Sequence, residues 1–289
     1  MEQRITDDTA LPALTAGVFF HHLPGGHHAS PYTADIFAGF YSFKSHRPVH
    51  WIQCDTEHLE DYIRTNRLDG AVIVSPNFTD NDAVLSRVRD TGLPVVLVNH
   101  DASHLGIPSV RSDNTSALTE LARHLVVTLK VKHAAFVGYS LRFYDAVERL
   151  SAFRKALSDF GGSLFDDDVL FTEGDTAKLI EWLNRVVRPD SRPRALVVNT
   201  EFIVRQTMIW TRESRIRVPA DIYIAGFDDP VVYELNEPTI TAIKQPLVEL
   251  GTTAAQMLLS RMEHPDAKLF DIVLENKIIY RTSLPLGHQ

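Results

Sequence analysis

Short apolar segments alternate with longer segments of helical periodicity along almost the whole of this 289-residue sequence. Several of the short segments are continuous apolar runs, as in strands that are buried on both faces. The expected strands span residues 14–20, 49–53, 70–75, 94–99, 134–138, 168–171, 194–199 and 221–226. Because strands alternate with helices, the sequence predicts parallel sheets covered by helices, which is an α/β fold.

The alternation restarts near Tyr139, with about five strand–helix units before this residue and three or four after it. This restart predicts two similar lobes, each a parallel sheet flanked by helices. The end of the chain departs from the alternation, because residues 270–274 and 277–281 are both rich in strand-forming residues. Glu275 and Asn276 between them favour a turn, so this region is interpreted as a β-hairpin.

Composition narrows the classes of function. The net charge is −8 and no run of Lys and Arg stands out, which argues against a large nucleic-acid-binding face. Cys54 is the single cysteine, so it forms no internal disulfide and offers no metal-ligand spacing; we interpret it as a packing residue. The apolar runs are too short to cross a bilayer and the N-terminus lacks a signal-peptide core, so we expect a cytoplasmic protein without membrane contact.

The segment 218–246 is the most informative for function. Its expected strand ends at Gly226 and Phe227 and is followed by two carboxylates, Asp228 and Asp229. In open parallel sheets, ligands bind at the carboxyl ends of the strands. We therefore expect Asp228 to contact a ligand, and Asp229 to cap the following turn or helix.

The chain resembles the effector-binding core of LacI/GalR-type transcriptional regulators. The motifs that carry the resemblance are Val218-Pro219-Ala220-Asp221, Gly226-Phe227-Asp228-Asp229, Lys244-Gln245-Pro246 after Thr241, Leu250-Gly251 and Arg281-Thr282-Ser283. Looser matches occur in the same order at residues 68–73, 93–96, 112–114, 136–138, 148–150 and 153–157. Together these motifs cover nearly the whole chain from Leu14.

The resemblance implies the fold of periplasmic sugar-binding proteins, in which three crossing strands join the two lobes. It places the crossings near 138–139, 243–245 and 268–270. The lobes would then comprise residues 12–138 with 245–268 and residues 139–244 with 269–289, after a residual linker of residues 1–11. It also implies a homodimer that binds a small polar effector, often a sugar, between the lobes. No cofactor and no metal ion is expected.

The resemblance also implies a set of ligand-binding residues. Asp228 matches an acidic position that accepts hydrogen bonds from ligand hydroxyls, and Arg149 matches an arginine that reaches the ligand with a planar fork of donors. The alternative for Arg149 is a solvated salt bridge to Asp145 or Glu148. Gln245 is either a ligand contact or a hinge hydrogen bond, and Asp113 is either a ligand contact or a helix cap. The other candidates are Asn199, Asp145, Thr176, Tyr32, Phe143 and Phe227.

The segment 21–28 contains four histidines in eight residues, at a place where relatives have effector contacts. His21 and His22 are candidate ligand contacts. The alternatives are solvated side chains or a metal site, although no Cys or carboxylate accompanies the histidines.

About a dozen residues precede the first expected strand, and they contain no pair of amphipathic helices. We therefore expect that the helix-turn-helix headpiece of the family is absent and that operator DNA is bound only through such a headpiece. Two other classes of protein stay open, a freestanding or extracytoplasmic sugar-binding protein and, less favoured, a sugar-processing enzyme. Against an enzyme, the sequence lacks the G-x-S-x-G, P-loop, G-x-G-x-x-G and H-E-x-x-H motifs.

Overall fold

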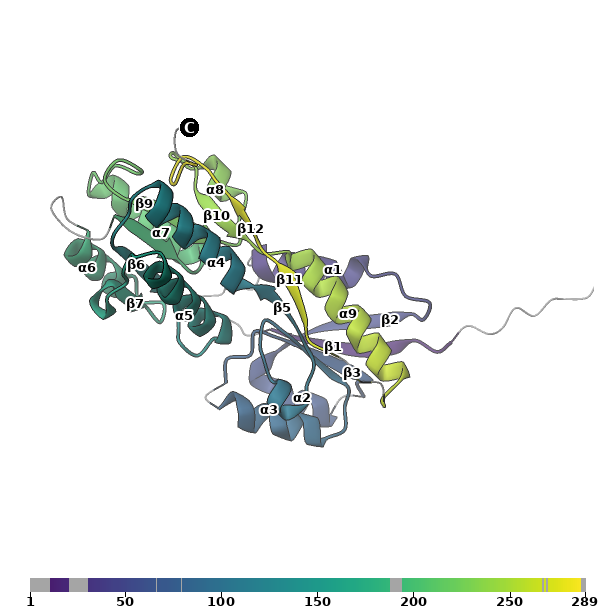
Figure 1. Ribbon diagram of the computed structural model, residues 1–289. Coiled ribbons are helices and arrows are strands. Elements are labelled where there is room, and N and C mark those ends of the chain that lie inside the picture. The colour runs from purple at the N-terminus through teal and green to yellow at the C-terminus, as the bar shows by residue number, and fades with distance from the viewer. Residues whose placement is uncertain are drawn as a thin grey trace, which may run out of the picture.

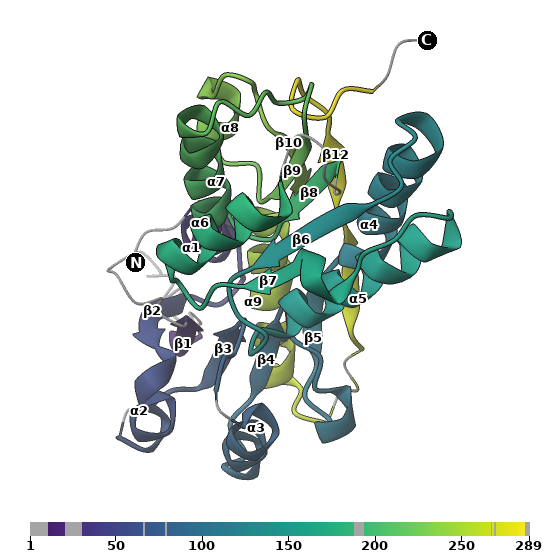
Figure 2. The ribbon, with the colours of Figure 1, turned by 90° about the vertical axis from the view of Figure 1, so that its left-hand side faces the viewer.

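The computed structural model describes residues 11–20, 31–65, 67–78, 80–187, 194–266, 268 and 270–286. The described residues form two sheets of six strands, each covered by helices on both faces. In both views the lobe built on the second sheet lies above the lobe built on the first (Figures 1 and 2). The predicted two-lobed α/β fold is therefore confirmed.

The first sheet has the strand order β11-β5-β4-β3-β1-β2, and all of its strands are parallel. Its strands are β1 (Leu14–Phe20), β2 (Val49–Asp55), β3 (Gly70–Val74), β4 (Val95–Val98), β5 (Ser109–Asp113) and β11 (Ile272–Glu275). One face packs against α1 (Pro31–Ser42) and α9 (Leu247–Glu263), and the other against α2 (Leu59–Thr65) and α3 (Asn81–Asp90). Helices α1 and α9 touch so closely that a methyl group on Gly251 would lie 2.1 Å from the Ile36 carbonyl oxygen.

The second sheet has the order β12-β10-β9-β8-β6-β7, with β12 antiparallel to β10 and all other pairs parallel. Its strands are β6 (Ala134–Gly138), β7 (Val169–Phe171), β8 (Ala195–Val198), β9 (Tyr223–Phe227), β10 (Thr241–Lys244) and β12 (Lys277–Ile279). Helices α4 (Asn114–Arg123) and α5 (Tyr144–Asp159) cover one face, and α6 (Thr176–Val186) and α7 (Glu201–Glu213) the other. A π-helical turn, His124–Thr128, continues α4, and the short helix α8 (Val232–Leu235) follows β9.

The predicted β-hairpin is wrong. Strand β11 pairs with β5 of the first sheet, whereas β12 pairs with β10 of the second. The two strands form one extended run that passes from lobe to lobe through the buried residue Asn276 (Figure 1). The third crossing therefore lies at Asn276 and not at 268–270.

The first crossing also differs from the predicted position near 138–139. Strand β6 belongs to the second sheet, and the chain crosses between β5 and α4, at Asp113 and Asn114. The reason is that the leucines of α4 pack on the second sheet together with Phe136 of β6. The second crossing lies between β10 and α9, around Gln245. We propose lobe limits that follow the sheets, 11–113 with 245–275 and 114–244 with 277–286.

Candidate functional site

Polar residues follow the carboxyl ends of strands in both sheets. Ser75 follows β3, Asn99 follows β4, Asn199 follows β8 and Asp228 follows β9. Three of them, Ser75, Asn99 and Asp228, have positive φ angles of 44°, 53° and 77°. This left-handed backbone is uncommon outside glycine and clusters at binding sites.

Gln245 connects the two lobes at Asp228. Its Nε2 donates a hydrogen bond to Asp228 Oδ1, and its Oε1 accepts from Ser112 Oγ at 2.7 Å and from Asn99 Nδ2 at 3.2 Å. The backbone N–H of Asp228 donates to the Ile243 carbonyl at 3.0 Å, which fixes the loop against β10. Burial raises the pKa of the Asp228 carboxyl, while the charge of Arg149 and the hydrogen bond from Gln245 oppose that shift.

Tyr32 adds a hydroxyl group from α1 to the same site. Its oxygen lies 2.8 Å from Ser75 Oγ and accepts a hydrogen bond from Asn99 Nδ2 at 2.9 Å. Burial first, and then the charge of Asp145, raise the pKa of Tyr32, so the phenol is protonated at neutral pH. Since Tyr32 belongs to the first lobe and Asp145 to the second, the two lobes meet here.

Arg149 is 2% exposed and is held by protein groups of the second lobe. Its Nε donates to Asn114 Oδ1 at 3.0 Å, and its Nη1 donates to Asn199 Oδ1 at 2.9 Å. Its Nη2 lies 3.2 Å from Asp145 Oδ2, and the guanidinium lies 4.0 Å from the centre of the Phe227 ring. The ion pair with Asp145 is therefore present, but it is not the solvated salt bridge of the alternative, because Arg149 is buried and Asp145 is 16% exposed.

A second group of contacts joins β5 and the β4–β5 segment of the first lobe to α5 of the second. Arg111 Nη1 donates to the Tyr144 hydroxyl at 3.2 Å and lies 3.9 Å from Glu148 Oε1. The His100 and Tyr144 rings meet edge to face at 5.4 Å. Burial raises the pKa of Glu148, which accepts a hydrogen bond from Asn114 Nδ2 at 2.6 Å.

Seven of the predicted site residues lie in two adjoining groups of contacts. Tyr32, Gln245 and Asp228 belong to one series of hydrogen bonds through Asn99. Arg149 contacts Asn199, Asp145 and Phe227, and Phe227 directly precedes Asp228 in the chain. Asp113 caps α4 through a hydrogen bond of 2.9 Å from the Ser116 N–H. Phe143 lies beside Tyr139, with 6.3 Å between the ring centres, and Thr176 begins α6; neither takes part in the hydrogen bonds above. His21 and His22 lie outside the described residues.

Sequence reasoning missed several members of the network, chiefly Asn99, Ser112, Ser75, Arg111 and His100. The signal for Asn99 was available, because it directly follows the apolar run of β4. Arg111 gave no signal, since its contacts depend on how the lobes meet.

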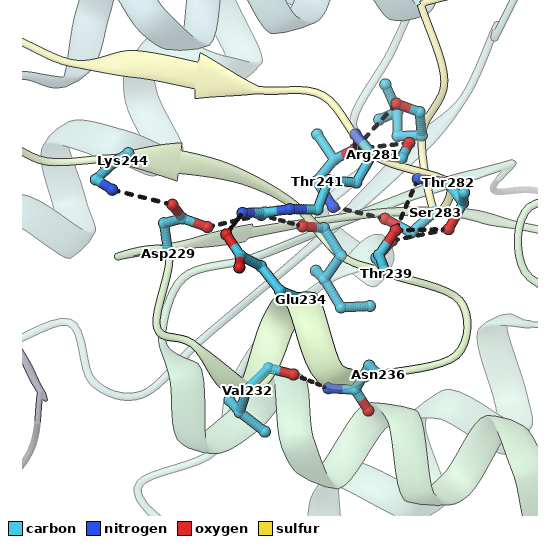
Figure 3. A network of polar contacts seen from close by, with 12 residues as sticks. Asp229, Val232, Glu234, Asn236, Thr239, Thr241, Lys244, Arg281, Thr282 and Ser283 are labelled. Atoms are coloured by element: carbon cyan, nitrogen blue, oxygen red, sulfur yellow. Dashed lines mark hydrogen bonds and ion pairs between the residues drawn. The ribbon is translucent and has the colours of Figure 1, made fainter.

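Asp229 does not cap a helix, in contrast to the expectation. Its carboxylate, 5% exposed, lies 2.6 Å from Arg281 Nη1 and 3.3 Å from Lys244 Nζ (Figure 3). Arg281 also donates to the Ile240 carbonyl at 2.7 Å and pairs with Glu234. Asp229 therefore joins the loop after β9 to the last residues of the second lobe.

A cavity of about 420 Å³ lies in the first lobe, beside the carboxyl ends of β2 and β3. It is lined by Thr56, Glu57, Asn77, Phe78, Asp80, Ala83, Val84 and Arg87. Within the described ranges, no three His, Cys, Asp or Glu side chains are grouped so that they could hold a metal ion. No helix in those ranges is long and apolar enough to span a membrane.

Comparisons with known proteins agree with this architecture. Residues 122–284 match the family model of the periplasmic binding protein-like domain. The catabolite control protein A of Priestia megaterium is 25% identical over 229 residues, which are 78% of this chain and 68% of that protein. A putative LacI transcriptional regulator from Bacillus cereus subsp. cytotoxis NVH 391-98 superposes with a TM-score of 0.83 at 19% identity, over 96% of this chain and 100% of that one.

A complex of the transcriptional regulator CelR with cellobiose superposes with a TM-score of 0.81 at 23% identity, over 94% of this chain and 86% of that one. At such identities these two structures support the fold. The family model covers more than half of the chain. The chain therefore belongs to the periplasmic binding protein-like domain family.

Proposed function

We propose that this protein is the effector-sensing core of a transcriptional regulator of the LacI type, acting in the cytoplasm. It binds a small polar ligand, a sugar or a sugar derivative, between its lobes, and ligand binding controls DNA binding. The observation that carries this proposal is the hydrogen-bonded series Tyr32–Asn99–Gln245–Asp228, because it joins the strand ends of both lobes at one place.

The chemistry of the network suits a ligand rich in hydroxyl groups. The carboxyl group of Asp228 accepts hydrogen bonds, while Asn99 and Gln245 are amides that both donate and accept. The CelR relative was solved with cellobiose, which supports a sugar as the ligand class. We propose that the chain senses its ligand and does not transform it, since the relatives named above are regulators.

Control of DNA binding would follow from the lobes' relative orientation. A ligand shifts that orientation only if its contacts differ between two arrangements of the lobes. Gln245 lies at a crossing and contacts both lobes, so a ligand that replaces one of its hydrogen bonds would favour a different arrangement. We assign operator binding to a headpiece and not to the lobes, because the net charge of −8 opposes contact with phosphates.

Thermal-shift measurements over sugars, sugar phosphates, polyols and nucleobases would identify the ligand, because a ligand that binds the native state raises its melting temperature.

Asp228→Asn keeps the side-chain shape and tolerates the left-handed backbone. Losing the charged acceptor should weaken affinity for the identified ligand about tenfold or more in calorimetric titration. The control is Asp61→Asn, which removes a carboxylate of the first lobe that is 74% exposed and pairs with Arg64, and which should leave the affinity unchanged. Unchanged affinity in Asp228→Asn would remove Asp228 from the site.

We further propose that the chain is a homodimer, which separates the regulator from a monomeric sugar-binding protein. Val231 directly precedes α8 and Leu235 ends it. They are 71% and 78% exposed, and a second copy would cover such apolar side chains. Sedimentation should give twice the 32.5 kDa of one chain. Val231→Asp with Leu235→Asp should shift the mass toward the monomer, and a monomeric unsubstituted chain would contradict the proposal.

A further inference from the structure

Asp145 occupies a central position in the proposed site. It lies on the first turn of α5, and its side chain is 16% exposed. Its Oδ2 is 3.2 Å from Arg149 Nη2, beside the Phe227 ring that supports the guanidinium. Its negative charge contributes to the raised pKa values of Tyr32 in the first lobe and of Asp228 and Glu148 in the second. The charge of Asp145 therefore acts on groups of both lobes.

The two arginines of the region are engaged by protein groups. The Nε and Nη1 atoms of Arg149 donate to Asn114 and Asn199, while Nη2 makes no hydrogen bond within the described residues and is ion-paired with Asp145. Arg111 contacts Tyr144, Asp101 and Glu148. Among the residues that the structure describes, Asp228 forms no ion pair, and its hydrogen-bond donor Gln245 is neutral. The excess charge at the site is therefore negative.

We infer that Asp145 is a specificity-determining residue that restricts the site to uncharged, hydroxyl-rich ligands, because it occupies Arg149 and repels ligand anions. This inference rests on the proposed function and deepens it by naming the charge class of the ligand. A phosphate or carboxylate placed near Asp228 would meet the charges of Asp145 and Glu201 as well. It would also have to compete with the Asp145 carboxylate for Arg149 Nη2, which is ion-paired with Asp145 but makes no hydrogen bond within the described residues. Neutral hydroxyl groups would instead donate to the same carboxylates.

Matched pairs of ligands test the charge class directly. We would titrate glucose against glucose 6-phosphate and gluconate, ribose against ribose 5-phosphate, and cellobiose against cellobionate, together with the ligand found by thermal shift and its carboxylate or phosphate derivative. For each sugar skeleton that binds, the neutral member should bind about tenfold or more tightly, since charge repulsion at a partly buried site amounts to more than one factor of ten. Equal or tighter binding of the anion would overturn the inference and leave the proposed function intact.

Asp145→Asn provides a test by gain of binding, which loss of folding cannot imitate. The substitution removes one negative charge and releases Arg149 Nη2, so the affinity for the anionic member should rise at least tenfold relative to the neutral member. Glu201→Gln is the matched control. It removes another carboxylate whose charge acts on Asp228, but this carboxylate pairs with Arg205 rather than Arg149. The ratio of the affinity for the anionic ligand to that for the neutral ligand should therefore change by a smaller factor.

The outcomes separate the two proposals. The role of Asp145 would be contradicted if the ratio of anionic to neutral ligand affinity did not change in Asp145→Asn. It would also be contradicted if Glu201→Gln changed that ratio as much as Asp145→Asn does. If no sugar, charged or neutral, binds the unsubstituted protein, the proposed function fails and the inference fails with it.

Discussion

Asp228 and Asp229 are neighbours in sequence but meet opposite environments. Asp228 accepts a hydrogen bond from the neutral Gln245, and burial raises its pKa. Asp229 is paired with two cations, Arg281 and Lys244. The first carboxylate is therefore suited to a ligand that brings its own donors, and the second is suited to fixing the loop that presents the first.

The ion pair of Asp229 with Arg281 should contribute strongly to stability. Arg281 and Asp229 have exposed side-chain fractions of 11% and 5%, so Arg281→Met would leave a buried carboxylate without its main partner. We expect the free energy of unfolding in urea to fall by about 3–5 kcal/mol. The matched control is Arg64→Met, which breaks a pair with Asp61 whose side chains are 76% and 74% exposed.

The control pair should contribute about 0–1 kcal/mol, because exposed charges are screened by water and salt. Losses of similar size in the two variants would contradict the assignment of Arg281 to a buried network. The network of Figure 3 would then be a set of weak surface contacts.

At the scale of elements, the alternation of short apolar segments with helical segments predicted eight of the strands and missed two, β5 and β10. The eight predicted strand segments coincide with β1 to β4 and β6 to β9 within about two residues at each end. Strand β5 was missed because Ser109, Arg111, Ser112 and Asp113 interrupt its pattern. Its backbone is held by β4 and β11, and such pairing is not visible in local sequence.

The C-terminal strands show why topology was harder to predict than strand positions. Strand-forming residues on either side of Glu275 and Asn276 suit a hairpin and a straight crossing equally well. The choice is made by partners far away in sequence, Val110 for β11 and Ile243 for β12. The same reason limits how much of the candidate site can be predicted from sequence. Asn199 and Asp228 were predictable from strand ends, whereas the contacts of Gln245 with Asn99 and Ser112 depend on the register between lobes.

At the scale of the whole molecule, the lobes meet through polar contacts as well as through the crossings. Arg111 of β5 faces Glu148 and Tyr144 of α5, and Asn114 at the first crossing donates to Glu148. Glu148 is therefore a titratable group at the contact between the two lobes. Its protonation state affects its interactions with Arg111 and Asn114.

The raised pKa of Glu148 predicts the sign of its effect on stability. Burial raises that pKa above 4.5, against the hydrogen bond from Asn114 and the charges of Arg111 and Arg149, while Asp145 adds to the shift. Between pH 4.5 and the raised value, the folded state binds a proton that the unfolded state lacks. This group's contribution to the free energy of unfolding therefore falls as pH rises through that window.

Glu148→Gln removes the titration and keeps an oxygen that accepts from Asn114. The free energy of unfolding of the variant minus that of the unsubstituted protein should therefore increase from below pH 4.5 upward and level off above the folded-state pKa. Asp221→Asn is a control of opposite sign, because the hydrogen bonds from Arg217 lower the Asp221 pKa from 3.8 to about 2. Its carboxylate stabilises the fold above pH 3.8, and that contribution is lost only as pH falls toward 2. Urea titrations at several pH values measure both differences, and a Glu148→Gln difference that does not vary with pH would show that Glu148 is not buried between the lobes.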